Sequence, residues 1–149
     1  MLRVLFLRAI WRRRLRVHKP AARSGQAMVE FAMVLPIALT LMFAIIQAGG
    51  ALYAYNFVAY AARSGARYAT VHGANSASPA TAASVSSYVS GLAVALNTAQ
   101  LTTTTTWLPN NNPGSLVSVD VSYIYKPLAP FIWSANLTLD SHTETTISN

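Results

Sequence analysis

The sequence predicts an α+β fold: a long N-terminal transmembrane helix, then a small exported domain with a short helix and a three-stranded antiparallel sheet. Three observations support this prediction. Residues 31–62 carry no charge, a longer run than the about 20 residues that span a bilayer. The C-terminal third alternates between apolar and polar residues, as β-strands do. The basic residues cluster before the apolar run.

The composition separates a basic leader from a nearly neutral body. Hydrophobic residues make up 53% of the chain and charged residues only 10%, whereas ordinary soluble domains are about 25% charged. Eight of the eleven Lys and Arg residues lie in the first 23 positions. The positive charge therefore belongs to residues 1–25 and does not indicate nucleic-acid binding. With no cysteine, disulfides and thiolate metal sites are excluded.

The leader itself has two interpretations. Residues 3–16 fit an amphipathic helix at the membrane surface, and they equally fit a solvated basic tail. Pro20 ends any such helix. Residues 21–25 are small and are expected to be flexible enough to enter a protease cleft.

The long helix is expected over residues 26–72, with the membrane span at about 31–52. The densest apolar part is 31–46, and an aromatic cluster typical of a membrane interface follows it: Tyr53, Tyr55, Phe57 and Tyr60. The alternative, a buried helix of a soluble core, rarely runs so far without a polar face. Because most basic residues precede the span, the N-terminus is expected in the cytoplasm and the C-terminal part outside.

Several residues modify this helix. Pro36 is expected to kink or loosen it because proline donates no backbone hydrogen bond. Ala61, Gly65 and Ala69 are four residues apart and form a face of small residues. Such a face accepts another helix or packs within its own chain, and the spacing does not choose between them. His72 and Gly73 are expected to end the helix.

The exported domain is expected at residues 85–149, after a small polar linker at 73–84. Apolar residues at helical spacing predict a short helix over 85–99. Residues 101–108, 115–125 and 135–147 predict three strands, with a hairpin turn at 110–114. The loop at 126–134 carries aromatic residues that either reach the membrane or pack on the sheet.

No pattern in the sequence indicates an enzyme, a metal site or a cofactor site. The three histidines are scattered, and there is no phosphate-binding loop or nucleophile motif. His142 and Glu144 share one face of a strand, which fits a solvated edge better than a site. Asn136 begins a glycosylation sequon, a pattern that is common by chance.

One segment resembles a known family. Gly25-Gln26-Ala27-Met28-Val29-Glu30-Phe31 has the form of a type IV prepilin signal: basic leader, glycine, four residues, glutamate, aromatic residue and long apolar helix. The longer string GQAMVEFAMVLPIAL is similar to the opening of TadE-like minor pilins (pseudopilins) of the tight-adherence (Tad/Flp) system. Residues 60–69 resemble the Ala/Arg-rich stretch that follows the span in that family. The resemblance covers about residues 23–70.

The resemblance implies processing and assembly. A prepilin peptidase would cut between Gly25 and Gln26 on the cytoplasmic side, since a side chain at residue 25 would crowd its cleft. The product would be a minor pilin in the bacterial inner membrane or in a surface pilus. Its partners would be the peptidase, major and other minor pilins, the inner-membrane assembly platform and membrane lipid, but no nucleic acid.

Glu30, followed by the aromatic Phe31, gains a role from the same resemblance. A carboxylate at the edge of hydrocarbon needs a partner, and cleavage would create one in the α-amine of Gln26, which is charged near neutral pH. The family pattern implies the amine of a neighbouring subunit. The amine of the same chain is an alternative, and a helix N-terminus favours a negative charge by itself.

Two other functions fit parts of the sequence. A signal-anchored envelope protein whose exported domain binds a partner explains the topology but not Gly25 and Glu30 together. An organellar or secreted precursor would use the basic residues as a transit peptide or residues 51–54 as a signal peptidase site. The apolar run is far longer than a secretory signal allows.

Overall fold

The computed structural model describes residues 23–128, 130 and 134–148. The expectations for residues 3–16, for Pro20 and for the aromatic residues at 131 and 133 lie outside this range. The chain forms two compact units, residues 1–38 and 39–149. The elements are α1 (Arg23–Val71), α2 (Ala82–Leu92), the 3₁₀ turn η1 (Thr98–Gln100), β1 (Leu101–Leu108), β2 (Leu116–Tyr125) and β3 (Leu137–Thr146). This arrangement confirms the predicted α+β class.

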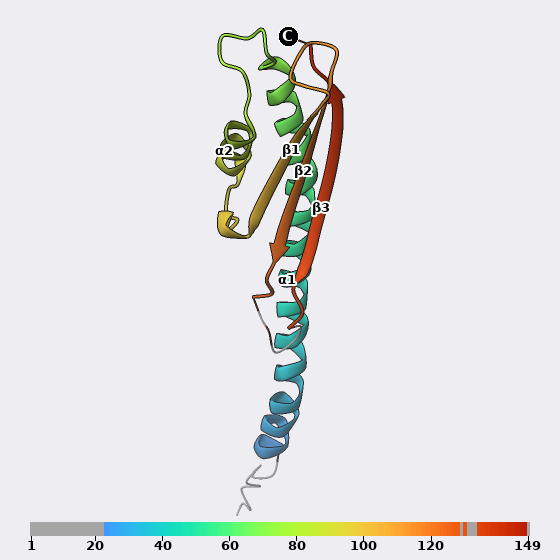
Figure 1. The fold of residues 1–149 in the computed structure, drawn as a ribbon. Helices are drawn as coiled ribbons and strands as arrows, with labels where there is room; N and C mark the ends of the chain where they lie inside the picture. The colour runs from blue at the N-terminus through green and yellow to red at the C-terminus, as the bar shows by residue number, and fades with distance from the viewer. Residues whose placement is uncertain (1–22, 129, 131–133, 149) are drawn as a thin grey trace, which may run out of the picture. The chain divides into compact units, whose positions relative to one another are not determined.

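The three strands form an antiparallel sheet in the order β1-β2-β3 (Figure 1). Threonine is the commonest residue in these strands, and threonine, like valine and tyrosine, fits a pleated, half-buried surface. The turn between β1 and β2 contains Gly114, whose φ of +85° suits glycine. β2 is the central strand, with Leu101 paired to Tyr123 on one side and Leu137 paired to Tyr125 on the other.

The core of the 39–149 unit lies between the helices and one face of the sheet. The second part of α1 contributes a buried face of small residues and Val58, while α2 contributes Val85 and Val89. Alternate residues of β2 are buried against them, namely Val117, Val119, Val121 and Tyr123. The outer face of the sheet is polar, so the sheet is covered on one side only.

Helix α2 differs from the expected 85–99 at both ends. It begins at Ala82, because Thr81 and Ser84 form a reciprocal capping box in which each side chain accepts from the other's backbone N–H. It ends at Leu92, because the next residue, Ala93, is extended with φ −74° and ψ 92°, and Ala95 with its positive φ of 59° keeps the chain from resuming the helix. The predicted helix end of 99 was therefore wrong, and η1 occupies that place.

Helix α1 also begins earlier than expected. It starts at Arg23, so residues 23–25 are helical and not the flexible stretch that the sequence suggested. Glycine costs a helix only about 1 kcal/mol relative to alanine, too little to end a helix that continues for 49 residues. The C-terminal end at Val71, followed by a turn at His72, agrees with the predicted stop.

Candidate functional site

The N-terminal turns of α1 carry the residues that the sequence singled out. Gly25, Gln26, Glu30 and Phe31 all lie in the helix and are exposed. The Gln26 side-chain amide Nε2 donates a hydrogen bond to Glu30 Oε1 at 3.0 Å. This contact joins residues four apart, one helical turn, as such side-chain pairs do on helices. From the same spacing, the sequence predicted the α-amine of Gln26 as the partner of Glu30. The contact in the structure uses the side-chain amide.

Among residues 23–128, 130 and 134–148, no contact requires glycine at position 25. A Cβ atom built there meets no other atom within 4 Å. Gly65 is the opposite case, since a Cβ there would lie 3.0 Å from Val89 Cγ2 and 3.3 Å from Val119 Cγ1. The fold therefore requires the small residue at 65, whereas no contact within the described part of the chain requires the one at 25.

Helix α1 is apolar and exposed ahead of the domain. The segment Gly25–Val71 is long and apolar enough to cross a membrane, with none of its most apolar window buried. The exposed side chains include Met28, Phe31, Val34 and Ile37. Pro36 lies inside this segment, and the helix continues on both sides of it. An apolar helix exposed all round is typical of a membrane span.

The small-residue face is used within the domain. Ala61 and Ala69 are fully buried, and Gly65 lies where α1 packs against α2 and β2. The face of small residues therefore packs within its own chain, which was one of the two expectations for it.

The outer face of the sheet contains one contact that sequence reasoning missed. His142 Nδ1 lies 2.7 Å from Asp120 Oδ1, with 57% and 53% of the two side chains exposed. Ser118 Oγ lies 3.4 Å from the same histidine nitrogen. Asp120 and His142 are direct partners in the β2–β3 register. The two strands were predicted from the sequence, but the register between them was not. Glu144 pairs with Ser118 instead.

These residues do not assemble a metal centre. Across residues 23–128, 130 and 134–148, no group of three or more His, Asp or Glu side chains is placed to hold a metal ion. More than half of each side chain in the His142–Asp120 pair is exposed, so its geometry is that of a surface contact.

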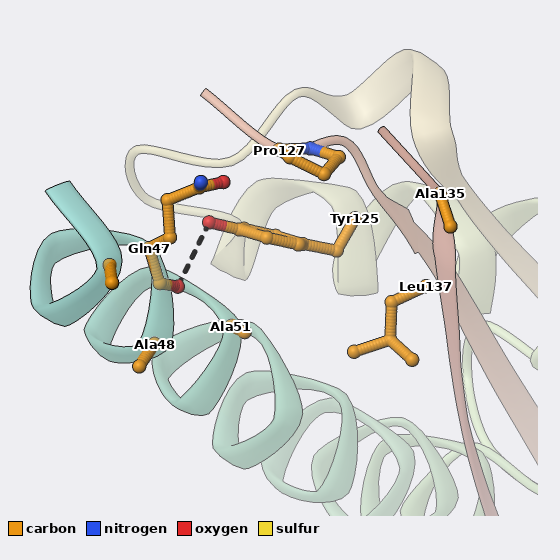
Figure 2. Close-up of a pocket in the computed structure, with 8 residues that line it drawn as sticks. Gln47, Ala48, Ala51, Tyr125, Pro127, Ala135 and Leu137 are labelled. Carbon is orange, nitrogen blue, oxygen red and sulfur yellow. Dashed lines mark hydrogen bonds between the residues drawn. The ribbon is translucent and has the colours of Figure 1, made fainter. Parts of the chain in front are cut away.

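A cavity of about 200 Å³ lies where β2 and β3 approach α1 (Figure 2). Its helix side is formed by alanines, Ala44, Ala48 and Ala51, and its other side by Tyr125, Pro127 and Leu137. The Tyr125 hydroxyl crosses the space and donates to the backbone oxygen of Gln47 at 3.2 Å. The recurrence of alanine at intervals of four and three was the signal for this face in the sequence.

Gly50 admits that tyrosine. A Cβ at position 50 would lie 2.7 Å from the Tyr125 hydroxyl, a distance that real side chains do not reach. The glycine and the tyrosine therefore fit each other, and together they fix this end of the domain to α1.

The fold and these residues fit the class of single-pass membrane anchors that carry a small α+β domain. Residues 25–67 match the family model described as TadE-like protein, a family associated with the Tad pilus. The resemblance inferred from Gly25, Glu30 and Phe31 is thereby confirmed, and this segment of the chain is similar to TadE-like proteins. No curated protein and no solved structure gives a significant match. The matched segment includes α1 through Arg67 and stops before the linker, α2 and the sheet.

Proposed function

We propose that this protein is a minor pilin of a Tad-type pilus, made as a precursor and cut between Gly25 and Gln26. The observation that supports the proposal most strongly is the combination of Gly25 and Glu30 at the start of an exposed apolar helix, inside the TadE-like segment. A general membrane anchor needs the apolar helix but neither of these two residues.

The environment of Gly25 supports processing. Glycine in a helix costs about 1 kcal/mol relative to alanine, and none of the residues that the structure describes comes within 4 Å of a Cβ built at position 25. A protease that must approach the backbone closely gives a reason, because glycine leaves room for that approach. Since α1 begins at Arg23, the peptidase has to open the first helical turn, and glycine lowers the cost of doing so.

Glu30 supports assembly. In the uncut chain its carboxylate accepts from the neutral amide of Gln26. Cleavage would free a cationic amine at Gln26. We infer that the amine of an incoming subunit pairs with Glu30, since a charged group at the edge of hydrocarbon is stabilised by an opposite charge.

The proposed setting follows from charge and from the family. The excess of basic residues before the apolar run supports an N-terminus in the cytoplasm and a domain outside the bacterial inner membrane. The partners are prepilin peptidase, the major and other minor pilins, the assembly platform and membrane lipid. TadE-like pilus proteins are not an enzyme family, and the chain is proposed to act by assembly.

Blocking cleavage tests the proposal. The variant Gly25→Val should leave the precursor uncut, with a larger band on a blot of the membrane fraction. Gly49→Val is the matched control, because Gly49 also lies in α1 with no atom within 4 Å of a built Cβ. It should be processed normally, and N-terminal sequencing of the wild type should begin at Gln26.

Two results would contradict this. A wild-type protein that keeps its leader would leave the signal-anchored envelope protein as the better function. A Gly25→Val variant of normal mature size would show that the cut lies elsewhere.

A further inference from the structure

The cavity beside Tyr125 lies at a defined depth along α1. The uncharged run begins at Phe31, and its twentieth residue is Gly50, which marks the end of a span of about 30 Å. The alanines of the cavity, Ala44, Ala48 and Ala51, bracket this position. If α1 crosses the membrane, the cavity opens at the boundary between hydrocarbon and headgroups.

Apolar side chains gather at the same end of the 39–149 unit. Leu128 is 75% exposed and is the residue after Pro127 of the cavity wall. Ile46 and Leu52 on α1 are also exposed. The opposite end of the sheet carries the turn Asn110–Asn112, whose side chains are polar. An exposed apolar patch next to a membrane span is best covered by lipid.

Charge at this end has one sign. Lys126 directly follows β2 and is exposed. The nearest carboxylates along the strands are Asp120 and Asp140, and Asp140 pairs with Ser122, three residues before Tyr125. A lysine at the headgroup level attracts anionic lipid.

The size and lining of the cavity select a narrow apolar occupant. At about 200 Å³ it is smaller than the roughly 300–1,000 Å³ of pockets that hold drug-sized ligands. Its helix wall consists of three alanines and Gln47, and the rest of the lining is Tyr125, Pro127, Ala135 and Leu137, so most of the surface is apolar. A hydrocarbon chain fits this surface, whereas a headgroup would find few polar partners.

We propose that this cavity holds an acyl chain of an anionic phospholipid, with the Lys126 ammonium beside the lipid phosphate. The bound lipid connects the end of the sheet at Tyr125 and Leu137 to the membrane leaflet that faces the domain. The inference rests on the membrane anchoring included in the proposed function, but it does not require cleavage or pilus assembly. It concerns the protein while it is in the bilayer.

Filling the cavity tests the proposal. Full-length protein in a neutral detergent is titrated with phosphatidylglycerol, and bound lipid is counted by native mass spectrometry. Ala51→Phe should lose one tightly bound lipid that the wild type keeps. Ala32→Phe, at an exposed position of α1 outside the cavity, is the matched control and should keep it. Ala135→Phe fills the cavity from its strand side and should repeat the loss.

The lysine is tested by lipid preference. Lys126→Gln should lower the preference for phosphatidylglycerol over phosphatidylcholine about fivefold, and Lys126→Arg should retain it. Retention of the lipid by both cavity-filling variants, or an unchanged preference in Lys126→Gln, would overturn the proposal. Circular dichroism of each variant shows whether a loss comes from unfolding, and a loss found only in unfolded variants also counts against it.

A depth measurement separates this proposal from the anchor itself. The chain has no cysteine, so a single introduced cysteine carries a unique spin label in vesicles that contain phosphatidylglycerol. Leu128→Cys should be accessible to oxygen and shielded from a polar nickel reagent, as should Leu41→Cys in the span. Asn112→Cys should show the reverse. A label at 128 that is solvated while the label at 41 is in the membrane would contradict the lipid site alone. Solvated labels at both positions would contradict the membrane anchor itself.

Discussion

The two parts of α1 use apolar residues in opposite ways. Between residues 25 and 46 the large side chains are exposed on all sides, as Met33, Leu41 and Ile45 illustrate. From Ala54 to Ala69 the buried positions are mostly alanine, with Gly65 at the closest contact. The first part is suited to a lipid solvent and the second to a sheet and a second helix. Hydrophobicity alone therefore does not define a core, because residue size and spacing distinguish the two.

The close contact at Gly65 provides the largest expected effect. Gly65→Leu would place a side chain against Val85, Val89 and Val119, and overpacking of this kind costs about 3 kcal/mol or more. We expect the domain to become sensitive to protease in full-length protein. Gly91→Leu is the control, because a Cβ at Gly91 meets no atom within 4 Å. Equal protease resistance of the two variants would contradict the packing described for α1.

Two valines compare the parts of the chain directly. Val119→Ala removes two methyl groups from a fully buried site and should lower the free energy of unfolding by about 2 kcal/mol. Val34→Ala makes the same change where the side chain is 61% exposed and should leave unfolding of the domain unchanged. Thermal melts in one detergent measure both. A comparable loss in Val34→Ala would mean that the exposed segment contributes to the folded core.

Glu30 tests the role of the exposed segment. Glu30→Ala should be processed normally but should co-purify with pilin subunits about tenfold less, as expected from the loss of one charge-assisted contact of about 1.5 kcal/mol. Gln26→Ala is the matched variant, since it removes the amide that contacts Glu30 and keeps the amine that cleavage would create. Normal assembly of Gln26→Ala supports the amine as the partner. Equal loss in both variants would assign the role to the amide.

The same comparison explains what the sequence could predict. The strand expected at 101–108 has those bounds, and the other two differ by one or two residues at their ends, because alternation and the Asn-Pro-Gly turn are local signals. The ends of α2 depend on the Thr81 cap and on the extended backbone at Ala93. The prediction used only the spacing of apolar residues and did not include these end signals. It therefore placed the start of the helix three residues too late.

The candidate site residues also differ in how far the sequence predicts them. Gly25 and Glu30 lie five residues apart in one helix, so the sequence contained their whole pattern. The cavity joins Ala51 to Tyr125 and Leu137, and the contact of His142 with Asp120 depends on strand register. Both need the tertiary arrangement, since no local pattern specifies which residue of β2 faces which residue of its neighbours.

The His142–Asp120 contact should have the smallest effect. Although the two atoms lie only 2.7 Å apart, more than half of each side chain is exposed, so solvent screens the attraction and the pair contributes at most about 1 kcal/mol. His142→Ala should therefore change the melting temperature much less than Val119→Ala does. A double-mutant cycle with Asp120→Ala measures the coupling between the two side chains. A coupling well above this value would mean that the pair is enclosed in the assembled protein, and the outer face of the sheet would then be a contact surface.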